Sequence, residues 1–231
     1  TLGGKKIWEN GISLELEGYL KYLNGVVEYA PLFSGLKENP LQRKPLFTFF
    51  EGNGFIRGID FFLKKYGKNF DGLVSYTLSK QTQTFKMVAN NRPFPAPSDR
   101  RHQLSVTGTY NLGKWSFGGN YTFASGRPYT DLEKIASAFN ESSRENLRIG
   151  DRISYLEDYH RIDLLVDWKS GHWTLGVGVF NLINRRNLAY RQFAFVFPST
   201  KGNLGSTSNI LAGNEVQMLG RTINARVQFS F

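Results

Sequence analysis

Strict alternation of apolar and polar residues is the feature that most constrains how this chain can fold. Such a period of two is satisfied by an extended strand with two unlike faces. It is clearest in the closing stretch RTINARVQFSF, whose apolar face would carry Ile223, Ala225, Val227, Phe229 and Phe231. Alternation of this kind recurs along the chain. It predicts eight strands, at about residues 11–30, 54–66, 70–85, 101–112, 115–126, 159–169, 172–184 and 219–231.

The connections between these strands alternate between short and long. The short turns are 67–69, 113–114 and 169–171, and the long segments are 31–53, 86–100, 127–158 and 185–218. Transmembrane barrels combine short periplasmic turns with long extracellular loops. A compact soluble domain seldom contains several loops longer than about 12–15 residues. The sequence therefore predicts an all-β fold, a transmembrane antiparallel β-barrel, with about eight strands in this chain.

Tryptophan placement supports a bilayer as the surroundings of these strands. Trp115, Trp168 and Trp173 adjoin short turns, and Trp8 precedes the first predicted strand. Indole rings favour the interface between lipid headgroups and hydrocarbon. The alternating runs also have the length, about 9–11 residues, that a tilted strand needs to cross the hydrocarbon. The alternative is that these aromatic residues cap the core of a soluble β protein.

The amino-acid composition limits which kinds of metal site, partner and catalytic group this chain can have. The chain has 231 residues, no cysteine and three histidines, and its net charge is 29 − 19 = +10. Thiolate metal sites and disulfides are excluded, and we expect no metal and no cofactor. The basic residues are spread over loops and strands instead of one element that reads a nucleic-acid groove, so no nucleic-acid partner is expected. His160 with Asp158 or Asp163 is a weak catalytic candidate without a second paired carboxylate, and we expect no enzyme activity.

Several stretches carry a family resemblance. FPAPSDRRHQLSVTGTYNLGKWSFGGNYTFASGRPYT, GIDFFLKKYGKNFDGLVSYTLSK and GVFNLINRRN resemble, in their order and spacing, late barrel strands of TonB-dependent receptors, notably those of Bacteroidetes. The chain end, with Phe231, Phe229 and Val227, resembles the signal by which outer-membrane proteins are handed to the barrel-assembly machinery. The resemblance covers about residues 11–231.

The resemblance implies a barrel of about 22 strands, of which residues 1–231 would be the C-terminal third. The plug domain and the earlier strands are not in this chain. It also implies uptake of a scarce nutrient, such as a ferric siderophore or another large ligand, by ligand binding and gated passage across the outer membrane of a Gram-negative cell. The implied partners are the lipid bilayer, lipopolysaccharide, the barrel-assembly machinery and the TonB complex acting through the plug. A surface lipoprotein is a further option.

Three alternatives remain open at this point. The chain could be a complete eight-stranded barrel. The barrel could be a structural or assembly scaffold in an outer-membrane complex, or it could be a passive porin. A plug domain with a TonB box would favour active uptake, a stable partner without them would favour the scaffold, and a constriction loop in an open lumen would favour the porin.

Arginines gather in the long segments, chiefly 127–158. The candidate ligand-binding residues there are Arg127, Tyr129, Arg144, Arg148 and Arg152. A guanidinium group offers forked donors that suit carboxylates, phosphates and catecholates. The alternative is that these arginines pair with acidic residues of the loops or bind lipopolysaccharide phosphates.

A second candidate group consists of charges on the polar faces of two strands. Its members are Arg161, Asp163, Asp167 and Arg226. An arginine facing lipid at the bilayer midplane would cost about 2–4 kcal/mol, so we expect these side chains to face the lumen. There they would form charge ladders that hold the wall or grip the plug, and a role in the substrate path is the less favoured interpretation.

Overall fold

The computed structural model describes residues 1–29, 49–86, 91–131, 133–134, 153–196 and 210–231, and it is nearly all-β. Its strands are β1 (Leu2–Ile7), β2 (Ile12–Tyr29), β3 (Phe49–Lys65), β4 (Phe70–Phe85), β5 (Phe94–Pro95), β6 (His102–Leu112), β7 (Trp115–Ala124), β8 (Pro128–Thr130), β9 (Ile153–Tyr155), β10 (Tyr159–Ser170), β11 (Trp173–Phe180), β12 (Leu188–Val196), β13 (Ile210–Gln217) and β14 (Thr222–Phe229). In the part of the chain that the structure describes, no helix is long and apolar enough to cross a membrane.

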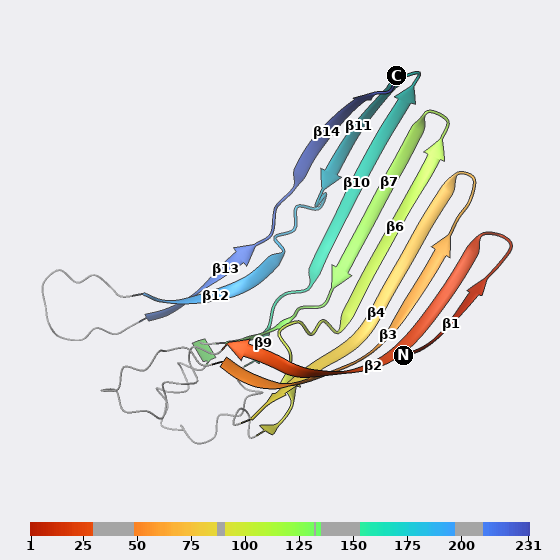
Figure 1. Ribbon diagram of the computed structural model, residues 1–231. Helices are drawn as coiled ribbons and strands as arrows, with labels where there is room; N and C mark the ends of the chain where they lie inside the picture. Colours follow the sequence, from red (N-terminus) through yellow and green to blue (C-terminus); the bar gives the residue numbers. More distant parts are fainter. Residues whose placement is uncertain (30–48, 87–90, 132, 135–152, 197–209) are drawn as a thin grey trace, which may run out of the picture.

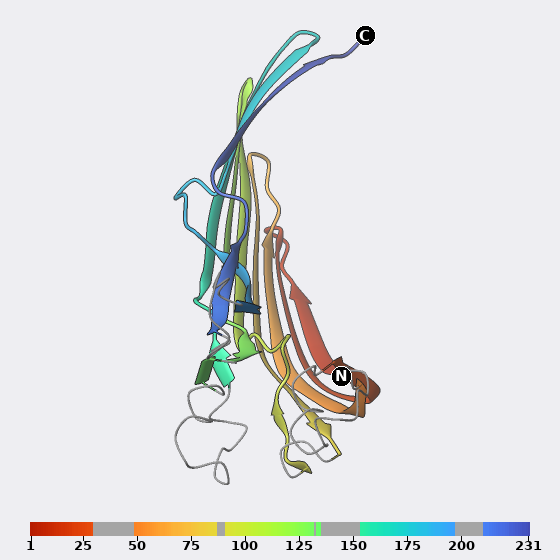
Figure 2. The same cartoon turned by 90° about the vertical axis from the view of Figure 1, so that its left-hand side faces the viewer.

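One antiparallel sheet dominates the structure. Its order is β1-β2-β3-β4-β6-β7-β10-β11-β14, with β5 paired to β4. The eight predicted strands are present in chain order as β2, β3, β4, β6, β7, β10, β11 and β14, which confirms the all-β antiparallel fold. The tight turns lie at one end of the sheet, and β9, β12 and β13 lie toward the other (Figure 1). Seen from the side, the sheet is a curved and twisted layer (Figure 2).

The structure also contains strands that the alternation did not predict. β1 pairs with β2 and makes the edge of the sheet. Its sequence, LGGKKI, holds two adjacent glycines and two adjacent lysines, which interrupt a period of two. Two expected long connections contain short paired strands, because β8 pairs with β9 and β12 pairs with β13. β3 begins at Phe49 rather than at residue 54, since it stays paired with the long β2.

The register between strands places apolar residues beside apolar residues and polar beside polar, so the sheet has one apolar and one polar face. One row across β4, β6, β7 and β10 consists of Val74, Val106, Tyr121 and Ile162. The next row consists of Ser75, Ser105, Thr122 and Arg161. Because the side-chain period is two, a slip of one residue would exchange these faces.

The apolar face is open to the surroundings. Leu164, Val177 and Val227 are 43%, 53% and 68% exposed. A soluble domain would cover such a band. A barrel wall instead turns its apolar face to lipid, which offers no hydrogen bonds, and satisfies its backbone through closed strand pairing. The exposed band is therefore the surface expected of a barrel wall.

Aromatic side chains gather at the turn end of this sheet. Trp115 and Trp168 are direct partners across β7 and β10. The Trp173 ring lies 4.8 Å from that of Phe229, and the Lys6 ammonium lies 5.2 Å from the ring of Trp8. Aromatic rings beside basic groups at one level suit a membrane interface.

Candidate functional site

Asp163 is the centre of a hydrogen-bond network on the polar face. Its Oδ2 accepts from Arg161 Nε at 2.9 Å and lies 3.4 Å from the Asn120 Nδ2 donor. Its Oδ1 accepts from the backbone N–H of Asn181 at 3.0 Å. The Asp163 side chain is only 15% exposed, and a carboxylate so covered needs partners of this kind. Asp163 thereby ties together β7, β10 and the segment that follows β11.

A second ion pair spans three strands. Both Asp167 oxygens accept from Arg226 Nη2 at 2.8 Å. The register runs from Asp167 on β10 to Gly176 on β11 and then to Arg226 on β14. A Cβ atom at Gly176 would lie 2.2 Å from Asp167 Oδ1, so the missing side chain leaves room for the pair to cross β11. The four predicted lumen charges thus form two ion pairs, and their lumen role remains a prediction.

At the other end of the sheet, the segment after β7 packs tightly against the segment before β10. The Gly126 N–H donates to Asp158 Oδ1 at 2.9 Å. A Cβ atom at Gly126 would lie 1.7 Å from the carbonyl oxygen of Leu156. The next residue, Arg127, accepts from the Leu156 N–H at 3.0 Å through its own carbonyl. The Arg127 guanidinium donates to the carbonyl oxygen of Ala189 on β12.

A cluster around Arg191 joins the two short hairpins. Arg191 Nη1 donates to the Tyr129 hydroxyl at 3.1 Å, and Arg191 Nη2 lies 3.2 Å from Glu133 Oε2. The hydrogen bond to Tyr129 is the main cause of a raised pKa at Arg191, and Glu133 adds to it. The rings of Tyr129 and Phe193 stack at 6.2 Å. Tyr129 therefore belongs to a contact between hairpins, and Arg191 pairs with an acid of the 127–158 segment.

Arg100 and Arg127 form a different arrangement, two neighbouring cations. Burial is the main cause of a lowered pKa at Arg100, and the positive charge of Arg127 lowers that pKa further. Neither guanidinium has an ion-pair partner within the described ranges. By contrast, Arg185 lies 3.7 Å from Glu157. An anion near Arg100 would offset the repulsion from Arg127, so these two arginines are candidates for binding an anionic ligand. Arg144, Arg148 and Arg152 lie outside the described residues.

Two asparagines after β11 have roles that the sequence reasoning missed. Asn181 Nδ2 donates to the Arg185 carbonyl at 2.9 Å, and its Oδ1 accepts from the Arg185 N–H at 3.1 Å. Asn187 makes the same two-way contact with the backbone of His160, at 2.8 Å and 3.1 Å. At His160, the Asn187 amide thus makes the two backbone hydrogen bonds that a neighbouring strand would otherwise make with β10. The three asparagines of NLINRRN could have indicated such contacts, because asparagine side chains readily bond to nearby backbone groups.

We expect Asn187→Ala to lower the free energy of unfolding by about 2 kcal/mol, because it leaves a backbone donor and acceptor of His160 without partners. Asn187 is 4% exposed, so water has little access to the vacated groups. Asn184→Gly is the control, since the Asn184 side chain accepts one backbone bond, from Arg221 at 3.0 Å, and glycine tolerates the φ of +50° at this position. Chemical denaturation of the two variants checks the difference. Equal midpoints would show that the His160 contact contributes no more stability than the single bond from Arg221.

Of the two carboxylates considered with His160, Asp158 accepts from the Gly126 N–H at 2.9 Å, and Asp163 lies on the opposite face of the sheet from the His160 ring. Its Nδ1 lies 3.0 Å from the Tyr121 hydroxyl, and its ring lies 5.0 Å from that of Phe123. These contacts are on the apolar face, whereas Asp163 belongs to the polar face. In the described ranges, no three His, Asp or Glu side chains group as the ligands of a metal would.

Comparison with known proteins decides the family. Residues 1–182 match the family described as TonB dependent receptor-like, beta-barrel. The chain belongs to this family. TonB-dependent receptor barrels are outer-membrane receptors and transporters, so the two-faced sheet described above is part of the wall of such a barrel. The comparison with curated protein sequences gives no match.

Solved structures of outer-membrane and siderophore receptors share the fold of this chain. The ferripyoverdine receptor of the outer membrane of Pseudomonas aeruginosa has a TM-score of 0.60 at 12% identity, over 96% of this chain and 25% of the receptor. The siderophore receptor PiuA from Acinetobacter baumannii has a TM-score of 0.60 at 14% identity, over 98% and 27%. FpvAI, in its complex with pyocin S2, has a TM-score of 0.61 at 13% identity, over 98% and 26%. The chain thus spans about a quarter of the length of these proteins.

Proposed function

We propose that this chain is the C-terminal portion of the barrel of an outer-membrane TonB-dependent receptor that takes up a scarce nutrient, such as a ferric siderophore or another large ligand. The main support for this proposal is the sheet itself, which has an exposed apolar band on one face and a hydrogen-bonded polar network on the other. That arrangement suits a wall between lipid and an aqueous or plugged lumen. The receptor would bind the ligand and let it pass through a gated path, with the TonB complex supplying the energy through a plug.

The likeness to two siderophore receptors supports the ligand class. PiuA and the ferripyoverdine receptor share the fold of this chain at low identity. The adjacent cations Arg100 and Arg127 suit an anionic ligand, because guanidinium groups bind carboxylates and catecholates through forked donors. We propose that these two residues contribute to the ligand site together with Arg144, Arg148 and Arg152. The Bacteroidetes-like motifs make a Bacteroidetes receptor the proposed source.

Further partners follow from the same proposal. We propose that Phe231, Phe229 and Val227 form the signal to the barrel-assembly machinery; the Phe229 and Phe231 rings meet edge to face at 5.4 Å. The two ion pairs of the polar face would face the plug. Lipopolysaccharide and a surface lipoprotein are the proposed partners outside the barrel.

Uptake in cells tests the proposal. Cells carrying or lacking the intact gene are given a panel of ⁵⁵Fe-labelled siderophores, with and without a working TonB complex. Uptake of one of them that needs both the gene and TonB would support an active receptor. Uptake that continues without TonB would indicate a porin instead. A gene whose loss removes a surface complex without changing uptake of any tested ligand would indicate a scaffold.

We expect the double variant Arg100→Gln, Arg127→Gln to bind its anionic ligand about tenfold more weakly or worse, since it removes two charge-assisted donors. Arg92→Gln with Arg186→Gln is the control with the same loss of charge, because both side chains are exposed. Equilibrium binding to the intact receptor in detergent checks this. Equal affinities for the two double variants would remove Arg100 and Arg127 from the ligand site.

A further inference from the structure

One face of the β12–β13 hairpin lies against the segment that follows β7. Alternate residues of β12 make the contact, namely Ala189, Arg191 and Phe193. The Arg127 guanidinium donates to the Ala189 carbonyl oxygen. The Tyr129 hydroxyl accepts from Arg191 Nη1 at 3.1 Å, and the Tyr129 ring stacks on Phe193 at 6.2 Å. Because side chains two residues apart share one face of a strand, a single face of β12 joins the two long connections.

The contact with Arg127 depends on an irregularity in β12. The register between β12 and β13 shifts between Leu188 and Tyr190, so Ala189 has no partner on β13. An extra residue in a bulged strand stays outside the ladder of backbone hydrogen bonds. Its carbonyl oxygen needs another donor, and the Arg127 guanidinium supplies one. The bulge thus offers a fixed backbone acceptor to a side chain of the other long connection.

Glu133 holds Arg191 and both strands of the hairpin at one level. Its Oε2 lies 3.2 Å from Arg191 Nη2, and its Oε1 accepts from the Gly213 N–H at 3.2 Å. Gly213 on β13 is the register partner of Phe193 on β12. The Arg191 side chain is 27% exposed, and a charge-assisted pair that is partly covered is stronger than an exposed one. The hairpin is therefore fixed two residues from Ala189.

Arg127 needs such a fixed acceptor because a second cation lies near it. Its positive charge lowers the pKa of Arg100, and like charges repel each other. Among the described residues, no carboxylate forms an ion pair with Arg127. The Ala189 carbonyl therefore fixes the Arg127 guanidinium at a place that its own charge disfavours.

We propose that Arg191 is a positioning residue for the anionic-ligand site. Its contacts hold the β12–β13 hairpin against the segment after β7, and the hairpin presents the Ala189 carbonyl to Arg127. Arg127 thereby stays beside Arg100. Arg191 itself would not touch the ligand, because its terminal nitrogens face the phenol and the carboxylate described above. The inference rests on the proposed function only in treating Arg127 as a ligand contact.

Chemical modification of the intact receptor in detergent tests this positioning without any ligand. Phenylglyoxal forms adducts with accessible guanidinium groups, and mass spectrometry of peptides gives the reaction rate at each arginine. We expect Arg127 to react about tenfold faster in Arg191→Gln than in the wild type, because its guanidinium would be released from a charge-assisted hydrogen bond. Arg191→Lys keeps a cation opposite Glu133 and should restore most of the slow rate.

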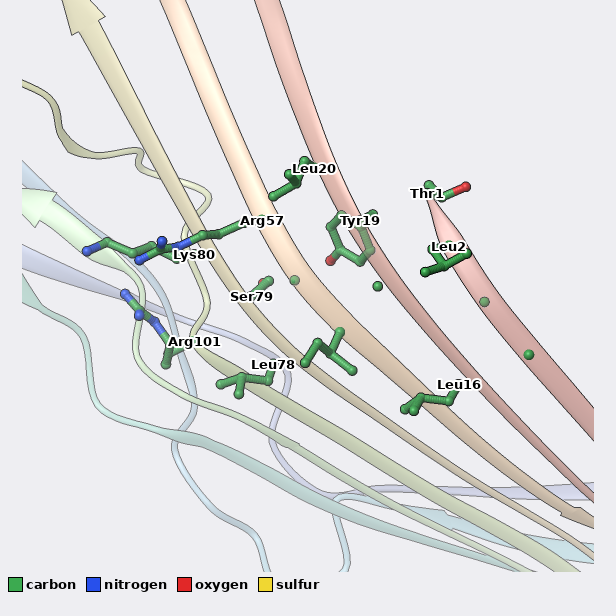
Figure 3. A pocket seen from close by; sticks show the side chains of 15 residues that line it. Thr1, Leu2, Leu16, Tyr19, Leu20, Arg57, Leu78, Ser79, Lys80 and Arg101 are labelled. Atoms are coloured by element: carbon green, nitrogen blue, oxygen red, sulfur yellow. The ribbon is translucent and has the colours of Figure 1, made fainter.

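Arg101 is the internal reference for the reaction rate. It points toward the same region as Arg57 and Lys80, which belong to β3 and β4 (Figure 3). Loss of the β12 contact should therefore leave its rate unchanged. The matched control variant is Arg186→Gln, which removes one exposed arginine from the same long connection. It should leave Arg127 as slow as in the wild type.

The reference also separates lost positioning from lost folding, since an unfolded variant would react faster at Arg101 as well. Glu133→Gln breaks the same ion pair from the opposite side, and it provides the measurement if Arg191→Gln does not fold. An unchanged rate at Arg127 in the folded variants would overturn the proposal. So would an equal acceleration of Arg127 in Arg186→Gln.

Uptake of ferric siderophores distinguishes failure of this inference from failure of the proposed function. Faster modification of Arg127 in Arg191→Gln, in a receptor that takes up no siderophore through TonB, would uphold the positioning and refute the transport proposal. TonB-dependent uptake with an unchanged Arg127 rate would refute the positioning alone. In a receptor that does transport, Arg191→Gln should weaken binding of the transported ferric siderophore only while Arg127 is present. An equal loss in an Arg127→Gln background would overturn the inference.

Discussion

Replacing Gly126 with alanine should lower the free energy of unfolding by about 3 kcal/mol, because the new methyl group has no space. It would lie 1.7 Å from the carbonyl oxygen of Leu156. That oxygen belongs to backbone held by the hydrogen bond from the Leu156 N–H to the Arg127 carbonyl, so it cannot swing aside as a side chain would. The segments before and after the 127–158 connection would have to separate. Arg127 would then lose its position beside Arg100.

Gly119→Ala is the matched control, since Gly119 lies in the same hairpin and its added Cβ would meet only Leu164 Cδ2, at 3.6 Å. Denaturant titration of both refolded variants gives the comparison. Ligand affinity adds a second measurement, because a displaced Arg127 should weaken binding while Gly119→Ala leaves it unchanged. Overlapping unfolding curves for the two alanine variants would contradict the close packing at Gly126.

The strands could be predicted because alternation is a local property, readable within one strand. The stretch that became β14 alternates without interruption, although its pairing with β11 is made across the long 185–218 connection. β1 could not be predicted in this way. Its glycines and lysines break the period, and it is held as a strand by its pairing with β2. β12 and β13 follow each other in the chain and pair with Val196 opposite Ile210, but neither stretch shows the clear alternation that predicted the other strands.

The candidate site was predictable by residue type and less so by geometry. Arg161, Asp163 and Asp167 could be assigned to one face from their spacing alone. Their partners depend on register between strands, which the sequence leaves open. Asn181 and Asn187 were missed because their side chains bond to backbone groups of Arg185 and His160, and this role appears only once the ends of β10 and β11 are placed. The need for glycine at position 176 likewise becomes clear only when the register places Asp167 and Arg226 on either side of it.

Arg226→Gln should lower the free energy of unfolding by about 2 kcal/mol, since it leaves the Asp167 carboxylate, 12% exposed, without its cation. Gly176→Ala should weaken the same pair by a different route. Its Cβ would lie 2.2 Å from Asp167 Oδ1 and 3.4 Å from Arg226 Nε. The carboxylate would have to rotate away, and the bidentate contact would be lost.

If both variants act on one ion pair, their effects will not add. We expect a double-mutant cycle to give a coupling energy of about 1 kcal/mol or more between Gly176→Ala and Arg226→Gln. Gly178→Ala is the control from the same strand, because its Cβ would meet the uncharged Asn224 Oδ1 at 2.4 Å. Its cost should add to that of Arg226→Gln. Additivity at Gly176 as well would mean that the glycine serves β11 itself. Coupling there would mean that β11 has no side chain at this position because β10 and β14 bind each other across it.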